Sequence, residues 1–573
     1  MDELIRRLKL KPALTAELVV ASFFANLLAL ASPLFVTQVL NRYVNYRVNA
    51  TLVTLAVGMV MALALEFSFR QVRIRIARCI SAGPDRQAML ASFGVLTKAR
   101  LAALERIPPG LRREILDGAA AVENSFNANN LAALFDVPFA LLFVFVLSLL
   151  SPVLALIVLF FMAVVFASAA VGAKAVRQRS RELLNAAAMG NTLVNTAVRE
   201  AETVRSFNAG PFLDELWQKQ SAVTSGLRQW IIGRQGLLQI VTRSAAGYMS
   251  LFIITFGAIL VVDGDLSIGA LIGSNILASR ALMPIARLAS LIAEFIKAEQ
   301  SLKIMREFAK LPLEAVGGSA KRQYSGAIEL RDLAFVYPGA KGPLFESMNL
   351  TLAPGEILCV NGANGSGKTT LARLITGILE PVRGHVFVDG LDLRQTAPAW
   401  WRRQIVYLPQ EPAFLNATLG ENLKINNPEV QEERLNQIID AAGLRDFLDE
   451  SDGGFQTPIT NNGRHLALGV RRRLALARAL TTDGKLAVFD EPMEGLDAEG
   501  RKAVAGVIKA LVRGGRAVIL MSHDAGLLKE ADIILDLNMK PSPKVTRMTD
   551  ELRAVAKAAK AAKAGKKQEA AAQ

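Results

Sequence analysis

Long apolar runs in the N-terminal half constrain the fold of this chain more than any other feature. A membrane-spanning helix needs about 20 predominantly apolar residues, and a hydrophobic fraction of 52% with a mean hydropathy of +0.31 is too apolar for a wholly soluble protein. Buried core helices are the alternative, but the number of such runs argues against it. The sequence therefore predicts an α-helical membrane domain over residues 1–310. Its expected spans are residues 18–40, 52–69, 131–150, 153–171, 246–262 and a more polar sixth, 266–293.

The distribution of charge predicts the orientation of these spans. Ten basic residues lie between Arg70 and Arg113, and another ten lie between Lys174 and Arg243. The connections on the opposite side are short and carry few charges. Because basic residues collect on the cytoplasmic side of membrane proteins, both termini are expected in the cytoplasm. This topology explains most of the net charge of +15, so nucleic-acid binding is not required and membrane lipid is the expected environment.

Few residues suggest processing, disulfides or metal binding. Basic residues precede the first span and no clear small-residue cleavage site follows it, so no cleavable signal peptide is expected. The only cysteines, Cys79 and Cys359, fall in different domains on the expected cytosolic side, where disulfides are rare. The three histidines, His385, His465 and His523, form no metal-binding cluster in the sequence.

A glycine-rich segment between an expected strand and an expected helix predicts phosphate binding in the C-terminal half. Glycines let the backbone wrap a phosphate chain, and the following helix N-terminus adds positive potential. In this pattern Lys368 would reach the β- and γ-phosphates, and the Thr369 hydroxyl would bind Mg²⁺. The predicted phosphate-binding residues are Gly362, Ala363, Asn364, Gly365, Ser366, Gly367, Lys368, Thr369 and Thr370.

Other polar residues follow hydrophobic strands of the same domain. Asp490 and Glu491 end one strand, where Asp490 would hold the Mg²⁺ shell and Glu491 would orient or deprotonate the attacking water. His523 follows another strand and could touch a γ-phosphate, because ligands bind at the carboxyl edge of parallel sheets. Gln410 could contact Mg²⁺ and report to the membrane domain, and Tyr337 could stack on adenine.

The composition changes from helical to linker-like over residues 311–327, and residues 328–540 then read as an α/β domain. Short β-rich runs alternate with helices there, which predicts a largely parallel core sheet. Residues 541–573 form a basic, Ala/Lys-rich tail with little apolar bulk, so this tail is expected to be disordered or marginally helical. The expected strands are residues 328–330, 356–360, 385–388, 405–408, 486–489, 517–521 and 533–537.

On these motifs the C-terminal 245 residues resemble the nucleotide-binding domain of an ABC transporter. The resemblance assigns Tyr337 to the adenine-stacking loop, residues 362–369 to the Walker A motif and Gln410 to the Q-loop. It assigns Asp490 and Glu491 to Walker B, Asp497 to the D-loop and His523 to the switch histidine. Short breaks in the long cytoplasmic helices are expected near residues 118–124 and 207–213, either as plain loops or as turns that present a small helix to a partner domain. Six spans fused ahead of such a domain resemble an exporter half-transporter, which implies ATP, Mg²⁺, a second ABC half-transporter and coupling helices at these two breaks.

The membrane half resembles a narrower group, the type I secretion ABC transporters. The resemblance lies in residues 23–40, 134–143, 269–272 and 279–282. It implies export of an unfolded protein from the bacterial inner membrane through a membrane-fusion protein and an outer-membrane channel. The expected type is the shorter one, without an N-terminal peptidase-like domain. Export of a lipid or small amphiphile is an alternative, and an ATP-binding structural or regulatory subunit with little hydrolysis is a third.

One family motif is degenerate in this chain. Where the family has the signature Leu-Ser-Gly-Gly-Gln, the chain has Leu466, Ala467, Leu468, Gly469 and Val470. Ala467 lacks the hydroxyl that would bond the γ-phosphate, and the D-loop reads Glu-Gly-Leu-Asp in place of Ser-Ala-Leu-Asp. Losing one preorganised donor costs on the order of 10²–10³ in rate. Because each site in such a dimer combines one chain's Walker motifs with its partner's signature, a heterodimer, a slow homodimer and a non-cycling protein all stay open.

Overall fold

The computed structural model describes residues 2–44, 46–47, 49–321 and 323–548. The chain divides into two compact units, one ending at Leu313 and one containing the chain from Glu314 onward together with Arg100–Ala102. In the described part of the first unit, six helices are long and apolar enough to cross a membrane, which confirms the predicted number of spans. These candidate spans are Pro12–Val44, Asn49–Lys98, Ala128–Leu150, Pro152–Arg199, Gly210–Val262 and Ile268–Ala309.

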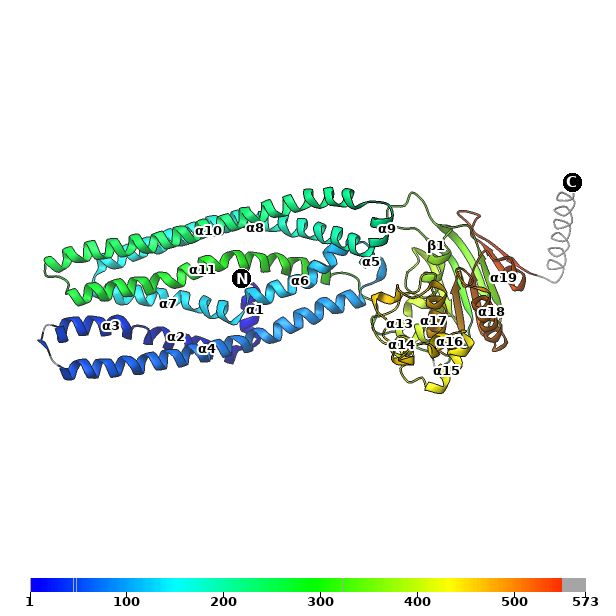
Figure 1. The fold of residues 1–573 in the computed structure, drawn as a ribbon, viewed down its shortest axis with the longest axis horizontal. Helices are drawn as coiled ribbons and strands as arrows, with labels where there is room; N and C mark the ends of the chain where they lie inside the picture. The colour runs from blue at the N-terminus through cyan, green and yellow to red at the C-terminus, as the bar shows by residue number, and fades with distance from the viewer. Residues whose placement is uncertain (1, 45, 48, 322, 549–573) are drawn as a thin grey trace. The chain divides into compact units, whose positions relative to one another are not determined.

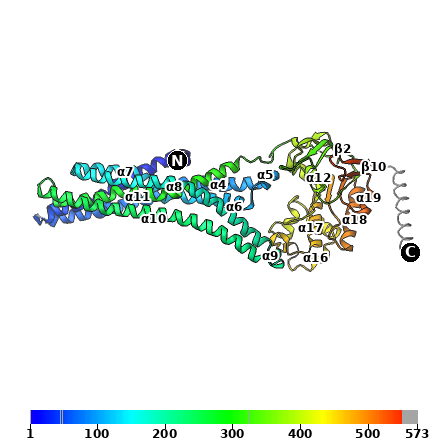
Figure 2. The same ribbon diagram turned by 90° about the horizontal axis from the view of Figure 1, so that it is seen from above.

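The helices of the membrane unit extend well beyond the apolar runs. Figures 1 and 2 show α8 and α10 as long helices that run side by side, and α11 packs against α6, α7, α8 and α10. Several helix starts are set by capping side chains: Asn127 caps α7, Ser151 caps α8 and Ser267 caps α11. The helices are α1 (Asp2–Leu10), α2 (Pro12–Leu28), α3 (Ala31–Gln38), the π-helix η1 (Val39–Val44), α4 (Asn49–Lys98), α5 (Leu101–Glu105), α6 (Pro109–Ser125), α7 (Ala128–Leu150), α8 (Pro152–Arg199), α9 (Ala201–Ser206), α10 (Gly210–Val262) and α11 (Ile268–Ala309).

Two acidic side chains within the spans, Glu66 and Asp136, are paired. The Glu66 carboxylate of α4 forms an ion pair with Arg70 of the same helix at 2.7 Å. Asp136 of α7 pairs with Arg73 of α4 and accepts a hydrogen bond from Asn26 of α2 at 2.9 Å. Intramembrane charges are costly unless they pair or face water, and these contacts tie α2, α4 and α7 together.

The helical break expected at residues 118–124 is wrong, because these residues lie inside the continuous helix α6. Gly118 does not form a turn. It lets α6 pack closely against α11, because a Cβ at this position would lie 3.3 Å from Cβ of Ser301. The short helix of this segment is α5, which lies between the end of α4 and Pro108. The break expected near residue 207 does exist, because α9 ends at Ser206 and α10 begins at Gly210.

The second unit contains two sheets. A six-stranded sheet has the order β10-β9-β3-β8-β7-β6 and is parallel except for the β9–β10 pair, which confirms the largely parallel core sheet. A four-stranded antiparallel sheet has the order β2-β1-β4-β5. The strands are β1 (Ile328–Phe335), β2 (Phe345–Leu352), β3 (Ile357–Asn361), β4 (Arg383–Val388), β5 (Leu391–Asp392), β6 (Ile405–Leu408), β7 (Leu486–Asp490), β8 (Ala517–Met521), β9 (Ile533–Asp536) and β10 (Lys544–Arg547).

Two apolar cores cover the two faces of the parallel sheet. One core contains residues of α15, α17 and α18, and the other joins the parallel sheet to the antiparallel sheet and α12. Figure 1 shows α17 and α18 beside the strands. The helices are α12 (Lys368–Ile375), α13 (Pro398–Arg403), α14 (Leu419–Lys424), α15 (Glu432–Ala441), α16 (Arg445–Asp449), α17 (Leu468–Leu480), α18 (Ala498–Arg513) and α19 (Ala525–Glu530), with 3₁₀ turns at Leu393–Gln395, Gly454–Gln456 and Asn461–Gly463.

Two features of this unit differ from the sequence analysis. The antiparallel strands β2 and β5 were not expected. The expected tail also begins too early, because Lys544–Arg547 form β10 and Arg547 pairs with Glu356 at 3.0 Å. The rest of that tail, residues 549–573, lies outside the described residues.

Candidate functional site

The glycine-rich loop connects β3 to α12 as expected. Its last glycine, Gly367, is the N-cap of α12 and has φ of 112°, a conformation that favours glycine. A Cβ there would lie 2.8 Å from Cδ2 of Leu344. The buried Lys368 begins α12 and donates from Nζ to the carbonyl oxygen of Gly362 at 2.6 Å. The loop therefore closes around its own lysine, with the N-terminus of α12 facing the same space.

Two carboxylates lie opposite this loop at the end of β7. Asp490 is the last residue of β7, and both of its carboxylate oxygens are buried without a hydrogen-bonding partner of good geometry among the described residues. Glu491 follows with φ of 47°, which is uncommon for a residue with a side chain. Its carboxylate lies 3.1 Å from Nζ of Lys368 and 3.4 Å from Nδ1 of His523. The site thus joins the ends of β7 and β8 to the phosphate loop.

The remaining predicted residues connect to the loop by hydrogen bonds. Thr369 donates from Oγ1 to the side-chain oxygen of Gln410 at 3.2 Å. The hydroxyl groups of Tyr337 and Thr370 share a hydrogen bond of 2.8 Å, and residue Tyr337 is 40% exposed. An exposed aromatic face fixed at the rim of the loop is suited to stacking on a flat ring.

These residues surround a cleft of about 340 Å³. Gly362 and Ser366 shape the loop but are not among its lining residues. Leu344 and Glu494 line the cleft and were not predicted as site residues, although Glu494 departs from the family's D-loop pattern. The cleft is lined by Tyr337, Leu344, Ala363, Asn364, Gly365, Gly367, Lys368, Thr369, Thr370, Gln410, Asp490, Glu491, Glu494 and His523.

Burial shifts the pKa of two acidic groups on strands of the parallel sheet, one of them in the cleft. Burial raises the pKa of the Asp490 carboxyl above its ordinary value and adjacent Glu491 adds to the rise, while the Thr369 hydroxyl and the Lys368 ammonium oppose it. Burial likewise raises the pKa of the Cys359 thiol to about 12. The Cys359 thiol is therefore inert at neutral pH. A cation near Asp490 would stabilise the ionised form of its carboxyl.

The donor set around Asp490 fits Mg²⁺. A carboxylate, a hydroxyl and an amide oxygen come from Asp490, Thr369 and Gln410, and Mg²⁺ prefers oxygen ligands. It is commonly bound by one or two carboxylates together with substrate phosphates. The unpartnered oxygens of Asp490 are what such an ion would satisfy.

The signature residues and Asp497 do not join this cleft. Ala467 is the N-cap of α17, and Leu466 and Val470 pack against the apolar core beside that helix. Asp497 is the N-cap of α18 and accepts a hydrogen bond from the backbone N–H of Gly500 at 2.7 Å. One chain therefore gathers the Walker residues, the Q-loop and the switch histidine, but not its own signature.

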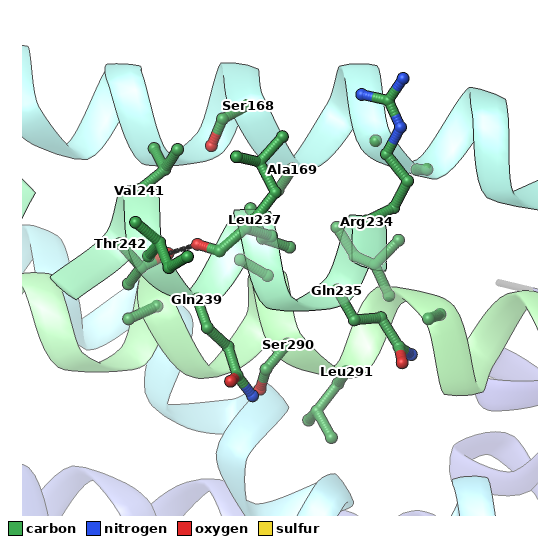
Figure 3. Close-up of a pocket in the computed structure, with 18 of the residues that line it drawn as sticks. Ser168, Ala169, Arg234, Gln235, Leu237, Gln239, Val241, Thr242, Ser290 and Leu291 are labelled. Atoms are coloured by element: carbon green, nitrogen blue, oxygen red, sulfur yellow. Dashed lines mark hydrogen bonds between the residues drawn. The ribbon is translucent and has the colours of Figure 1, made fainter. Parts of the chain in front are cut away.

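A second cavity, of about 1490 Å³, lies in the membrane unit between α8, α10 and α11. Figure 3 shows the polar side chains Gln235, Gln239 and Ser290 among apolar neighbours such as Leu237 and Val241. Its lining is mainly apolar with a few polar groups, which is typical of small-molecule sites.

Comparison with known families decides the identity of the two units. Residues 15–285 match the family of the ABC transporter transmembrane region, and residues 345–494 match the ABC transporter family. The chain belongs to the ABC transporter family. It is an exporter half-transporter, a multi-pass membrane protein with a cytoplasmic ATP-binding domain, and an ATPase coupled to transport. ABC half-transporters function as dimers.

Relatives of this ABC half-transporter include toxin translocators. The alpha-hemolysin translocation ATP-binding protein HlyB of Escherichia coli is 28% identical over 525 residues, which are 91% of this chain and 73% of HlyB. The exotoxin translocation ATP-binding protein PaxB of Pasteurella aerogenes and the leukotoxin translocation ATP-binding protein LktB of Mannheimia haemolytica are each 27% identical over the same shares.

A solved structure has the same fold. A bacterial Atm1-family ABC exporter with ATP bound superposes with a TM-score of 0.81 at 18% identity, covering 95% of this chain and 96% of that one. This likeness confirms the fold of a helical membrane domain followed by an α/β P-loop domain.

Proposed function

We propose that this half-transporter exports an unfolded protein across the bacterial inner membrane in a type I secretion-like system. The observation that supports this most is similarity over 91% of the chain to a translocator of alpha-hemolysin. Two further relatives are named for translocation of other toxins. A membrane-fusion protein and an outer-membrane channel would complete the pathway.

Deletion of the gene tests this proposal. The culture medium of the deletion strain should lose one or more proteins, and the wild-type chain should restore them. The Glu491→Gln chain is the matched control, because it should reach the membrane without supporting export. A medium with unchanged protein content, in a strain that has lost the chain, would contradict protein secretion.

In the ATP cycle, the chain's own residues would divide the work. Lys368 and the backbone of residues 362–367 would hold the β- and γ-phosphates. Asp490, Thr369 and Gln410 would hold Mg²⁺, which would supply positive charge to offset the charge of the phosphates. Glu491 would orient and deprotonate the attacking water, and His523 would contact the γ-phosphate. Tyr337 would stack on the adenine.

Because the signature is degenerate, the rate of ATP turnover would depend on which chain forms the dimer with this one. In a heterodimer, this chain's ATP could meet an intact signature on a second ABC half-transporter, and the partner's ATP would face residues 466–470 of this chain. A homodimer would carry the degenerate signature at both sites and would turn over slowly. Purification from native membranes tests this directly, because a copurified second half-transporter would establish the heterodimer and its absence from an active preparation would favour the homodimer.

Export of a lipid or small amphiphile is a second candidate. It is favoured by the cavity of about 1490 Å³ with its mixed lining in the membrane unit. Filling this cavity by Ser290→Trp should abolish stimulation of ATP hydrolysis by an amphiphile such as a lysophospholipid. Val262→Trp, on the exposed end of α10, is the matched control. ATPase activity that responds to no amphiphile would remove this candidate.

A further inference from the structure

Arg472 of α17 reaches three backbone segments around the ATP cleft from a buried position. Its Nη1 donates to the carbonyl oxygen of Glu491 at 3.0 Å and to that of Glu494. Its Nη2 donates to the carbonyl oxygen of Gln410 at 3.3 Å and forms an ion pair with the Glu494 carboxylate at 3.0 Å. One guanidinium therefore joins the Q-loop, the last residue of Walker B and the start of the D-loop.

The bond to Glu491 holds an unusual backbone in place. Glu491 has φ of 47°, in the left-handed region that residues with a side chain rarely adopt. Its N–H donates to the carbonyl oxygen of Met521 in β8 at 2.9 Å, and its carbonyl accepts from Arg472. Such a conformation persists only where the surroundings fix it. Arg472 and Met521 fix both polar groups of the Glu491 backbone, and thereby the direction of its side chain.

The ion-pair partner of Arg472, Glu494, occupies one of the positions that depart from the family's D-loop pattern. Glu494 stands where the pattern has Ser, and Gly495 stands where it has Ala. Gly495 also contacts the degenerate signature: a Cβ at Gly495 would lie 2.8 Å from Cδ2 of Leu468. The altered signature and the altered D-loop thus pack on each other at two neighbouring points of the same helix, α17.

We propose that Arg472 is a positioning residue for Glu491, and that Glu494 anchors it. In this arrangement the start of α17 and the segment from Glu491 to Gly495 move as one body. Leu468 and Gly495 provide the apolar contact, and Arg472 and Glu494 provide the polar one. The inference rests on the proposed role of Glu491 as the residue that activates water.

The test compares Arg472→Gln with Arg473→Gln in the full chain, purified in the assembly that hydrolyses ATP. Arg473 is the matched control, because it is the next residue of α17 and donates to the carbonyl oxygen of Gly443 at 2.6 Å, outside the ATP cleft. Misplacing a reacting group by about 1 Å costs about 10²-fold in rate. We therefore expect Arg472→Gln to lower kcat roughly 10- to 100-fold with KM for ATP within about threefold. Arg473→Gln should keep kcat within about twofold.

Two further variants separate positioning from folding. Glu494→Gln removes the negative charge that pairs with Arg472 from a half-exposed side chain. It should lower kcat, but by a smaller factor than Arg472→Gln does. The double variant Arg472→Gln/Glu494→Gln should be no slower than Arg472→Gln alone, because the two residues act as a unit. Hydrogen exchange over residues 491–497 should accelerate in Arg472→Gln and stay unchanged in Arg473→Gln, which gives a readout even where turnover is slow.

The results that overturn the inference are distinct from those that overturn the role of Glu491. Equal losses in Arg472→Gln and Arg473→Gln, or a raised KM with unchanged kcat, would assign Arg472 to helix stability or ATP binding. Undiminished hydrolysis in Glu491→Gln would instead remove the proposed role of Glu491 itself. An inactive Glu491→Gln chain beside an Arg472→Gln chain of normal kcat and exchange would reject the positioning role alone.

Discussion

The two halves of the ATP machinery within this chain are built differently. On the phosphate side, the loop, the carboxylates of Asp490 and Glu491 and the side chain of His523 surround one cleft. On the signature side, residues 466–470 begin a helix whose Leu466 and Val470 pack into the chain's own core. The difference supports the proposal that this chain keeps the groups that would bind and activate its own ATP, whereas the surface it would present to a partner's ATP departs from the family pattern.

The same contrast extends to the residues behind each half. Lys368 is directed at the cleft and pairs with Glu491, so the phosphate side carries its charge where a triphosphate would lie. Arg472 directs its charge inward, to backbone carbonyls and Glu494. On the signature side Arg472 therefore supports the catalytic loop from within. The five predictions below test whether the two halves are separable.

The largest effect is expected for Glu491→Gln on the phosphate side. General base catalysis contributes about 10²–10⁴ in rate, so ATP turnover should fall by that factor while ATP still binds. The measurement is steady-state phosphate release together with nucleotide binding by the purified chain. Glu499→Gln is the matched control, since Glu499 lies exposed in the first turn of α18. Equal turnover in both variants would break the assignment of catalysis to the phosphate side.

The next largest effect is expected for Lys368→Ala, through binding. A hydrogen bond to a charged group contributes about 1.5–3 kcal/mol, so ATP affinity should fall roughly 10- to 150-fold. The buried carboxylate of Glu491 also loses its cationic partner, which adds to the cost. Equilibrium binding of a fluorescent ATP analogue measures this loss. The control is Lys502→Ala on the exposed face of α18, and an unchanged affinity in Lys368→Ala would contradict the phosphate role.

Local motifs made the phosphate side predictable from the sequence. Residues 362–369 are contiguous, and the strands that carry Asp490 and His523 are short apolar runs whose carboxyl ends meet at one edge of the parallel sheet. Strand β2 was missed although its residues are buried in near alternation, a pattern that predicts a half-buried strand. Strand β5 has only two residues, too few for any periodicity.

Features that depend on tertiary packing could not be read from the chain. Gly118 looked like a break, but the structure uses its missing side chain for the close approach of α6 to α11. In the sequence Arg472 is the middle one of three consecutive arginines, and its proposed role depends on contacts with residues 19 and 62 positions away. Glu494 did give a signal, because it departs from the family pattern beside a catalytic residue.

Restoring the signature side should raise turnover by a smaller factor. In Ala467→Ser/Leu468→Gly/Val470→Gln, a hydroxyl, a close backbone approach and an amide return at the γ-phosphate of a partner's ATP. One such donor contributes on the order of 10²–10³ in rate, but removing Leu468 also opens a gap against Gly495. We expect a rise of roughly tenfold in the purified homodimer.

The matched comparison for this restoration is Ala467→Ser/Val470→Gln, which keeps the contact between Leu468 and Gly495. If the contact steadies the catalytic loop, the double variant will approach or exceed the triple one. A wild-type homodimer that already turns over at about 1–10³ s⁻¹ would show that the signature's loss is tolerated, and the heterodimer argument would lose its basis.

A smaller effect is expected from pH, through Asp490. Burial raises the pKa of this carboxyl, so it takes up a proton at higher pH than an ordinary aspartate does. The protein without nucleotide should therefore gain stability as pH falls through this raised pKa, whereas Mg²⁺ binding needs the ionised form and should weaken over the same range. Titration of Mg²⁺-dependent ATP binding against pH measures the second effect. In Asp490→Asn the pH dependence should vanish, and a persistent dependence would place the titrating group elsewhere.

The smallest effect is expected for Ala467→Ser alone, and it separates two roles of one position. Ala467 is the N-cap of α17, with φ of −54° and ψ of 143°, and a serine hydroxyl there can accept a hydrogen bond from the N–H of Gly469 or Val470. Replacing Ala by Ser at an N-cap typically stabilises a helix by about 1 kcal/mol. Hydrogen exchange over the first turn of α17 should therefore slow by roughly fivefold. Ala467→Val is the control, since valine lacks the hydroxyl and caps a helix no better than alanine. Because a cap acts within the chain, the slowing should be the same with and without ATP. Slowing that appears only with ATP would mean that the hydroxyl serves the partner's phosphate first, and that the signature side is less reshaped than its packing indicates.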